Sequence, residues 1–202
     1  MRIIAGTARG RRLKGPKGPG LRPTSDQVRE ALFNILGPSV HGARVLDLCA
    51  GTGALSFEAL SRGALHATLV DKGREALSLC RDNAALLDCR DRVDILPFSV
   101  DARLSQRLCQ HIDQRAGEHS AQNAEPGRPA FDLAFADPPY AAITPAQILA
   151  WLSPSLLTAD ATLVIEHDRR VEAPASAPGF ERFDARRFGD TALAFYGRAR
   201  TD

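Results

Sequence analysis

The sequence VLDLCAGTGAL, residues 45–55, predicts the fold more strongly than any other part of the chain. An apolar strand ends at Asp47, a glycine-bearing turn follows, and a helix begins near Ala54. Gly51 and Gly53 let the backbone approach a ligand because neither residue has a Cβ. A turn from strand to helix lies at the carboxyl edge of an open α/β sheet, where such folds bind their ligands. We therefore predict an α/β fold with a ligand site at this turn.

The rest of the chain alternates short apolar strands with helices. We predict strands near residues 43–48, 67–71, 93–97, 131–136 and 161–166, and helices near residues 53–62, 73–87, 101–115 and 145–157. This alternation requires a mainly parallel sheet that is covered on both faces. Residues 180–188 and 191–196 predict two strands joined by a tight turn. We expect a doubly wound, mainly parallel, seven-stranded sheet that ends in an antiparallel hairpin.

The N-terminal region differs in charge from the rest of the chain, although the net charge of the whole is only +2. Residues 1–30 carry eight Lys/Arg and two acidic residues, whereas the remainder carries 18 Lys/Arg and 22 acidic residues. A basic segment on a slightly acidic body suits a polyanionic partner, since each cation that meets a phosphate releases counterions. We predict a short basic N-terminal extension with a capping helix over residues 1–38, and the main domain over residues 39–202.

Within this extension we predict a strand, a loop and a helix. Residues 2–5 predict a short strand that a basic loop follows, and residues 24–27 predict a capping box at the start of the helix. The helix has an apolar stripe made of Val28, Ala31, Leu32, Ile35 and Leu36. Arg29 and Asn34 fall on the opposite face, so we expect Arg29 to face outward.

The composition excludes several classes of protein. The 44% hydrophobic and 25% charged fractions are typical of a folded globular chain. No apolar run approaches the roughly 18 residues of a membrane span, and the apolar patch at the N-terminus is too short for a secretory signal. The cysteines at 49, 80, 89 and 109 have no CxxC spacing, and the histidines form no HExxH pattern, so we expect no metal. We expect a cytoplasmic monomer without a membrane partner.

The residues around the glycine turn favour a nucleoside cofactor that carries a cation. A dinucleotide turn needs GxGxxG, but positions 51, 53 and 56 are Gly, Gly and Ser. Asp47 would repel a phosphate, whereas it suits the ammonium of a methionine moiety, directly or through water. Asp71, at the tip of the second strand, can accept hydrogen bonds from the ribose of either a nicotinamide dinucleotide or S-adenosylmethionine. Asp101 can cap a helix or hold an adenine amino group, and both interpretations stay open.

A second motif, Asp137-Pro138-Pro139-Tyr140, follows the strand predicted over residues 131–136. The two prolines remove two backbone donors and fix φ at about −65°. They therefore predict a rigid loop at the carboxyl edge of the sheet. Such a loop suits methylation of an aromatic amine, whose lone pair is delocalised into the ring. Asp137 and a backbone carbonyl near Pro138 can hold both N–H groups and turn the lone pair toward a methyl donor, while Tyr140 stacks on an extruded base. The motif order therefore predicts methyl transfer to an amino group of a nucleic-acid base.

These motifs resemble those of a known family. Asp47-x-x-x-Gly51-Thr52-Gly53 with Asp137-Pro138-Pro139-Tyr140 is similar to the amino-methyltransferase branch of the class I S-adenosylmethionine-dependent enzymes. More narrowly, the chain resembles the bacterial 16S ribosomal RNA guanine-N2 methyltransferases of the RsmD type. This narrower resemblance is carried by residues 1–6, 22–26, 29–34, 51–55, 188–191 and 195–196.

The resemblance implies a class I methyltransferase sheet, S-adenosylmethionine as cofactor, and the N2 of one guanine near the ribosomal P site, in a small-subunit particle, as substrate. The residues predicted to bind the cofactor are Asp47, Ala50, Gly51, Thr52, Gly53, Asp71, Lys72, Asp101 and Ala102. Those predicted to be catalytic are Asp137, Pro138, Pro139 and Tyr140, and those predicted to bind RNA are Arg9, Arg11, Arg12, Arg22 and Arg29. The chain departs from the family at Ser56, which replaces a frequent glycine, and at Cys49, which replaces a frequent aromatic residue.

Three other functions compete with this interpretation. A DNA adenine-N6 or cytosine-N4 methyltransferase uses the same proline motif but normally has a long target-recognition segment, and only residues 1–42 precede the first predicted strand. A nicotinamide-dependent dehydrogenase is disfavoured by Ser56 and Asp47. A non-catalytic RNA-binding assembly factor with this fold would keep its RNA affinity and its biological effect after Asp137→Ala.

Overall fold

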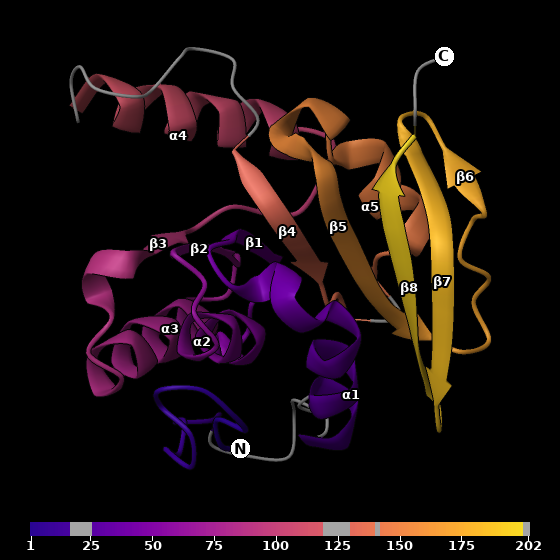
Figure 1. The fold of residues 1–202 in the computed structure, drawn as a ribbon. Coiled ribbons are helices and arrows are strands. Elements are labelled where there is room, and N and C mark those ends of the chain that lie inside the picture. The colour runs from indigo at the N-terminus through magenta and orange to yellow at the C-terminus, as the bar shows by residue number, and fades with distance from the viewer. Residues whose placement is uncertain (17–25, 119–129, 140–141, 200–202) are drawn as a thin grey trace.

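A computed structural model describes residues 1–16, 26–118, 130–139 and 142–199 of the chain. These residues form one mixed sheet with helices on both faces (Figure 1). The strands are β1 (Arg44–Leu48), β2 (His66–Val70), β3 (Val93–Leu96), β4 (Phe131–Ala136), β5 (Leu157–Asp168), β6 (Ser176–Ala177), β7 (Phe180–Phe188) and β8 (Thr191–Arg198). The helices are α1 (Asp26–Leu36), α2 (Ala54–Ser61), α3 (Arg74–Leu86), α4 (Leu104–Glu118) and α5 (Pro145–Trp151).

The strand order in the sheet is β3-β2-β1-β4-β5-β8-β7-β6. Neighbours from β3 to β5 pair in parallel, and neighbours from β5 to β6 pair antiparallel. The predicted α/β fold, with its mainly parallel sheet and closing hairpin, is confirmed. The prediction of seven strands is wrong by one, because Ser176 and Ala177 form an additional short strand that pairs with the start of β7.

Two apolar cores lie on opposite faces of the sheet. One contains Val45 and side chains of α1, α2 and α3, and the other contains Leu46 and side chains of α4 and α5. Successive residues of a strand point to opposite faces, so a strand covered on both sides needs apolar residues at nearly every position. This requirement explains the apolar sequence of β1, in which Arg44 at the start and the buried Asp47 are the exceptions.

The helix predicted over residues 145–157 is wrong in its second half. The helix α5 ends at Trp151, a 3-10 turn covers Pro154–Leu156, and β5 begins at Leu157. Proline has no N–H to donate and disfavours helical backbone in the residue before it, and Ser153 is accordingly extended, with ψ 129°.

The helix α1 buries a different face from the predicted one. Val28, Leu32 and Leu36 are buried as expected, but Ile35 is 40% exposed, and Phe33 and Arg29 are buried in its place. The predicted capping box falls partly outside the described residues. The apolar stripe alone therefore does not determine how this helix is rotated.

The N-terminal arm, residues 1–16, folds back on α2 and α3. An isolated antiparallel bridge between Arg2 and Arg12 replaces the strand predicted over residues 2–5. Ile3 and Leu13 are buried in the same core as α1, α2 and α3. Ser61 of α2 accepts a hydrogen bond from the Ala8 amide at 2.9 Å, which fixes the middle of the arm. The arm is thus packed on the body of the protein.

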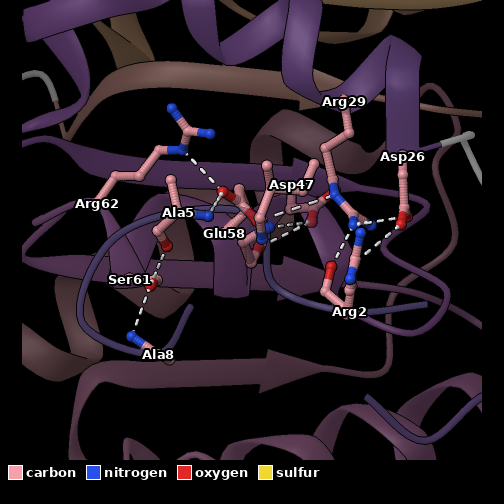
Figure 2. Close-up of polar contacts among 11 residues, drawn as sticks. Arg2, Ala5, Ala8, Asp26, Arg29, Asp47, Glu58, Ser61 and Arg62 are labelled. Carbon is pink, nitrogen blue, oxygen red and sulfur yellow. Dashed lines mark hydrogen bonds and ion pairs between the residues drawn. The ribbon is translucent and has the colours of Figure 1, made fainter. Parts of the chain in front are cut away.

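A buried carboxylate, Glu58 of α2, links the arm to α1 (Figure 2). Its oxygens accept the amides of Ile4 at 2.7 Å and Ala5 at 3.0 Å, and also pair with Arg62 Nε at 2.8 Å. Arg29 Nε lies 3.9 Å from Glu58 Oε2, and both side chains are fully buried. Two arm amides and two arginines therefore compensate one buried acid.

The Arg29 guanidinium is held by further partners at the start of α1. Its Nη2 donates to Asp26 Oδ1 at 3.0 Å and to the Arg2 carbonyl. Burial lowers the pKa of Arg29, and the nearby carboxylates of Asp26 and Glu58 oppose that shift. The side chain therefore belongs to the interior of the fold.

We predict that Arg29→Met lowers the free energy of unfolding by about 3 kcal/mol, at the low end of the range for breaking a buried ion pair. The loss is moderate because Glu58 keeps Arg62 and two arm amides. Urea unfolding measures the change. Arg186→Met, which breaks an exposed pair with Asp184, is the control and should change stability by less than about 1 kcal/mol. Equal effects of the two substitutions would contradict a structural role for Arg29.

Candidate active site

The carboxyl ends of β1, β2 and β4 lie side by side in the sheet. Leu48 at the end of β1 is in register with Val70 of β2 and with Ala136 of β4. The pairing continues past the strands, because the Ala50 amide donates to the Val70 carbonyl at 3.1 Å and the Asp137 amide donates to the Leu48 carbonyl at 3.2 Å. The structure therefore brings the glycine turn, residues 49–53, to the same edge as Asp137.

The glycine turn contains three residues with left-handed backbone: Cys49 at φ 63°, Gly51 at φ 56° and Gly53 at φ 77°. A Cβ at Gly53 would lie 2.4 Å from Phe57 Cε2 and 2.8 Å from Leu69 Cδ2, so packing requires glycine there. A Cβ at Gly51 would meet open space, with the Cys49 carbonyl oxygen nearest at 4.0 Å. The turn is thus packed tightly beneath Gly53 and accessible at Gly51, as a ligand-binding backbone requires.

Asp71, directly after β2, holds this turn in place. Its Oδ2 accepts the Gly51 amide at 2.9 Å, and its Oδ1 accepts the Gly73 amide at 2.8 Å. The carboxylate therefore joins the glycine turn to the start of α3. Lys72, the next predicted cofactor residue, is exposed, and Asp71 itself is half-buried.

Asp47 lies beneath the turn and is only 1% exposed. Its Oδ2 accepts the Ser56 hydroxyl at 2.7 Å and the Ser56 amide at 3.3 Å. Ser56, which stands where the family often has glycine, thus supplies a second donor to this acid. Burial raises the pKa of Asp47 to about 7, although both Ser56 hydrogen bonds lower it.

Negative charge accumulates around Cys49 at this edge. The pKa of its thiol is raised to about 12, first by burial and then by the carboxylates of Asp71, Asp47 and Asp137. Burial disfavours any charged group, whereas the three carboxylates would attract a cation to the same place. The electrostatics of the edge therefore favour a positively charged ligand.

Two further predicted cofactor residues, Asp101 and Ala102, follow β3. Asp101 Oδ1 accepts the Arg103 amide at 2.8 Å, and its Oδ2 pairs with Arg107 Nη2 at 3.1 Å. The Leu104 amide donates to the Asp101 carbonyl, at the beginning of α4. Asp101 therefore accepts backbone hydrogen bonds in the turn that leads into α4, and the adenine contact remains a prediction.

The proline loop follows β4 directly. Asp137 is half-buried, Pro138 is buried and Pro139 is exposed. The Pro139 carbonyl accepts the Ala142 amide at 2.8 Å, which closes the loop before α5. Tyr140 lies outside the described residues, so its predicted stacking role is a proposal only.

The five predicted RNA contacts fall into three groups. Arg9, Arg11 and Arg12 are exposed on the N-terminal arm, as an RNA contact requires. Arg22 lies outside the described residues. Arg29 is fully buried, and the prediction that it contacts RNA is wrong, because Glu58 and Asp26 hold its guanidinium inside the protein.

The sequence interpretation missed two residues of α3 that support the glycine turn. Cys80 Sγ donates to the Gly51 carbonyl at 3.3 Å, and Asn83 Nδ2 donates to the Thr52 carbonyl at 3.0 Å. The available signal was a polar residue on the inward face of a helix, since Asn83 falls one turn after Cys80. Within the described part of the chain, no group of three or more His, Cys, Asp or Glu side chains is placed to hold a metal, and no helix could span a membrane.

The family model described as "Conserved hypothetical protein 95" matches residues 1–197. The chain belongs to this family, the RsmD family of ribosomal RNA methyltransferases. The Bacillus subtilis relative named "Putative rRNA methyltransferase YlbH" is 34% identical over 197 residues, which are 97% of this chain and 98% of the relative. The "Ribosomal RNA small subunit methyltransferase D" of Escherichia coli is 39% identical over 140 residues, which are 69% of this chain and 60% of the relative.

The comparison with solved structures agrees with the family. The Escherichia coli structure described as "Putative methyltransferase yhhF" has a TM-score of 0.76 and 29% identity, and the match covers 98% of this chain and 97% of the other. The shared fold includes the mostly parallel sheet and the closing antiparallel hairpin.

We predict that Gly53→Ala lowers the free energy of unfolding by about 2–5 kcal/mol, from left-handed backbone strain plus a clash with Phe57 and Leu69. Gly42→Ala is the matched control, since Gly42 has the same φ of 77° with nothing within 4 Å of its Cβ position. It should cost only the strain of about 1–2 kcal/mol. Urea unfolding of both variants measures the difference, and equal losses would show that packing beneath the turn is loose.

Proposed function

We propose that this protein transfers a methyl group from S-adenosylmethionine to the exocyclic N2 of one guanine in the 16S ribosomal RNA of a small-subunit particle. The observation that supports the proposal most directly is the placement of Asp137 beside the glycine turn, at an edge that favours a cation. Membership of the RsmD family supports the choice of ribosomal RNA and of guanine N2.

The residues at the turn fit the cofactor. Gly51 is open to an approaching ligand, Asp71 can accept hydrogen bonds from ribose hydroxyls, and Asp47 provides negative charge below the turn for an ammonium group. Ala50, Thr52 and Gly53 complete the turn, Lys72 follows Asp71 after β2, and Asp101 with Ala102 would meet the adenine. When bound, S-adenosylmethionine supplies an electrophilic methyl group on a positively charged sulfur.

The proline loop prepares the acceptor amine. The N2 lone pair of guanine is delocalised, so the nitrogen attacks well only when it becomes more tetrahedral. The Asp137 carboxylate and a backbone carbonyl near Pro138 accept hydrogen bonds from the two N–H groups of the amine. These bonds direct the nitrogen lone pair toward the methyl donor, and Pro139 keeps the loop rigid. The nitrogen gives up one proton after the new N–C bond forms, so Asp137 positions the amine and stabilises charge more than it acts as a base.

The N-terminal arm supplies RNA contacts in this proposal. Arg9, Arg11 and Arg12 are exposed cations on a segment that Glu58 and Ser61 hold against the body. They would meet phosphates, Arg22 would add a further phosphate contact, and Tyr140 would stack on the extruded guanine. Residues 1–38 form the RNA-contacting extension and residues 39–202 the catalytic domain of a cytoplasmic monomer.

The decisive experiment supplies labelled S-adenosylmethionine together with small-subunit particles, large-subunit particles and DNA in separate reactions, and then identifies the modified base. Label on guanine N2 of the small-subunit RNA is expected. Label on a DNA base alone would replace this proposal with a DNA amino methyltransferase.

We predict that Asp137→Asn lowers kcat for small-subunit particles by about 10²-fold or more, because an amide cannot stabilise the developing charge as a carboxylate does. Asp132→Asn is the matched control, because Asp132 binds Arg44 at the start of β4, whereas Asp137 follows the end of that strand. It should keep kcat within about twofold, and thermal melts of both variants check their folding. A folded Asp137→Asn enzyme with unchanged kcat would favour a non-catalytic assembly factor.

We predict that affinity for S-adenosylhomocysteine, which carries the same ammonium, rises about tenfold from pH 5.5 to pH 7.0. The raised pKa of Asp47, about 7, leaves the acid mostly protonated at the lower pH, and a cation binds the ionised form better. Binding should therefore release a proton, which calorimetry in two buffers of different ionisation enthalpy measures. Asp47→Asn should flatten the dependence. An equal slope in both proteins would assign the proton to another group.

A further inference from the structure

Asn83 of α3 contacts two segments that are far apart in the sequence. Its Nδ2 donates to the Thr52 carbonyl of the glycine turn at 3.0 Å and to the Lys14 carbonyl of the N-terminal arm at 3.1 Å. Its Oδ1 accepts the Lys14 amide at 2.8 Å. The side chain is fully buried, so water cannot take the place of any of these hydrogen bonds.

Asn83 binds the backbone of Lys14 in the N-terminal arm. Asn83 satisfies both the N–H and the C=O of one residue, as a neighbouring strand would. The same helix binds the arm again through the Lys14–Asp82 ion pair at 3.1 Å and through Arg11, which donates to the Leu86 carbonyl. The end of the arm is therefore docked on α3.

The hydrogen bond to the Thr52 carbonyl links the glycine turn to the same Asn83 side chain. If the arm left α3, Asn83 would lose two of its three hydrogen bonds and would be free to rotate away from the Thr52 carbonyl. A buried amide with unmade hydrogen bonds is unfavourable, so docking of the arm and order in the turn favour each other. Cys80 supports the turn separately, through the Gly51 carbonyl, without touching the arm.

We propose that Asn83 is a positioning residue that couples RNA binding on the arm to cofactor binding at the glycine turn. The inference rests on the proposed function, because it takes Arg9, Arg11 and Arg12 as RNA contacts. RNA that binds these arginines holds the arm against α3 and so keeps the Thr52 carbonyl in place. The effect is reciprocal, and cofactor binding tightens the hold on RNA by the same factor.

Equilibrium dialysis with labelled S-adenosylhomocysteine, with and without saturating small-subunit particles, tests the coupling. In the wild type we expect the particles to tighten S-adenosylhomocysteine binding by at least about fivefold. In Asn83→Leu, which removes all three hydrogen bonds, this factor should fall to near one. Cys80→Ala is the matched control, since it should weaken binding under both conditions and leave the factor unchanged.

Hydrogen exchange of the amides of residues 51–53, measured without cofactor, gives a second readout. Particles should slow this exchange in the wild type and leave it unchanged in Asn83→Asp, which can still accept the Lys14 amide but cannot donate to the carbonyls of Thr52 and Lys14. If Asn83→Leu fails to fold, this comparison alone decides the proposal.

The outcomes separate the two proposals. Methylation of the particles without any change in S-adenosylhomocysteine affinity or exchange in the wild type overturns the coupling and leaves the proposed function intact. A variant at Asn83 that weakens binding equally with and without particles shows a structural residue only, and also overturns the coupling. Failure of the wild type to methylate particles overturns the proposed function instead.

Discussion

The hydrogen bond from the Asp137 amide to the Leu48 carbonyl is the contact on which the site depends. It extends the parallel ladder between β1 and β4 by one residue beyond the strands, so the glycine turn and the proline loop begin at neighbouring points. The bond from the Ala50 amide to the Val70 carbonyl does the same between β1 and β2. Because backbone pairing sets these distances, the side chains at the edge can vary without separating the two motifs.

A second constraint is the compensation of buried charge around Glu58. A carboxylate that is fully buried on α2 would be very unfavourable alone, and here it gathers the Ile4 and Ala5 amides, Arg62 and the Arg29 charge. The contacts join the arm, α1 and α2, which are separate in the sequence. The N-terminal arm is thereby positioned by the interior of the fold, while Arg9, Arg11 and Arg12 on it are exposed.

The sequence predicted the elements whose signals are local, and it failed where partners are distant. The glycine turn, the five strands before the hairpin and the closing hairpin itself follow from short-range patterns. The burial of Arg29 does not, because helical periodicity cannot show that an acid 29 residues later will compensate its charge. The role of Asn83 was missed for the same reason, since its partners lie in the arm and in the turn. The end of α5 could have been predicted, because Pro154 was visible in the sequence.

The carboxyl edge also explains why a family position tolerates serine. Asp47 is held by the Ser56 hydroxyl and amide, and Asp71 by the amides of Gly51 and Gly73, so these acids rely on neutral donors for their hydrogen bonds. Neutral donors stabilise a carboxylate without cancelling its charge, and these carboxylates add to burial in raising the pKa of the Cys49 thiol. A lysine or arginine in place of Ser56 would cancel that negative charge together with the attraction for a cationic ligand. Serine preserves it, and the departure from glycine is therefore compatible with the chemistry that the edge supports.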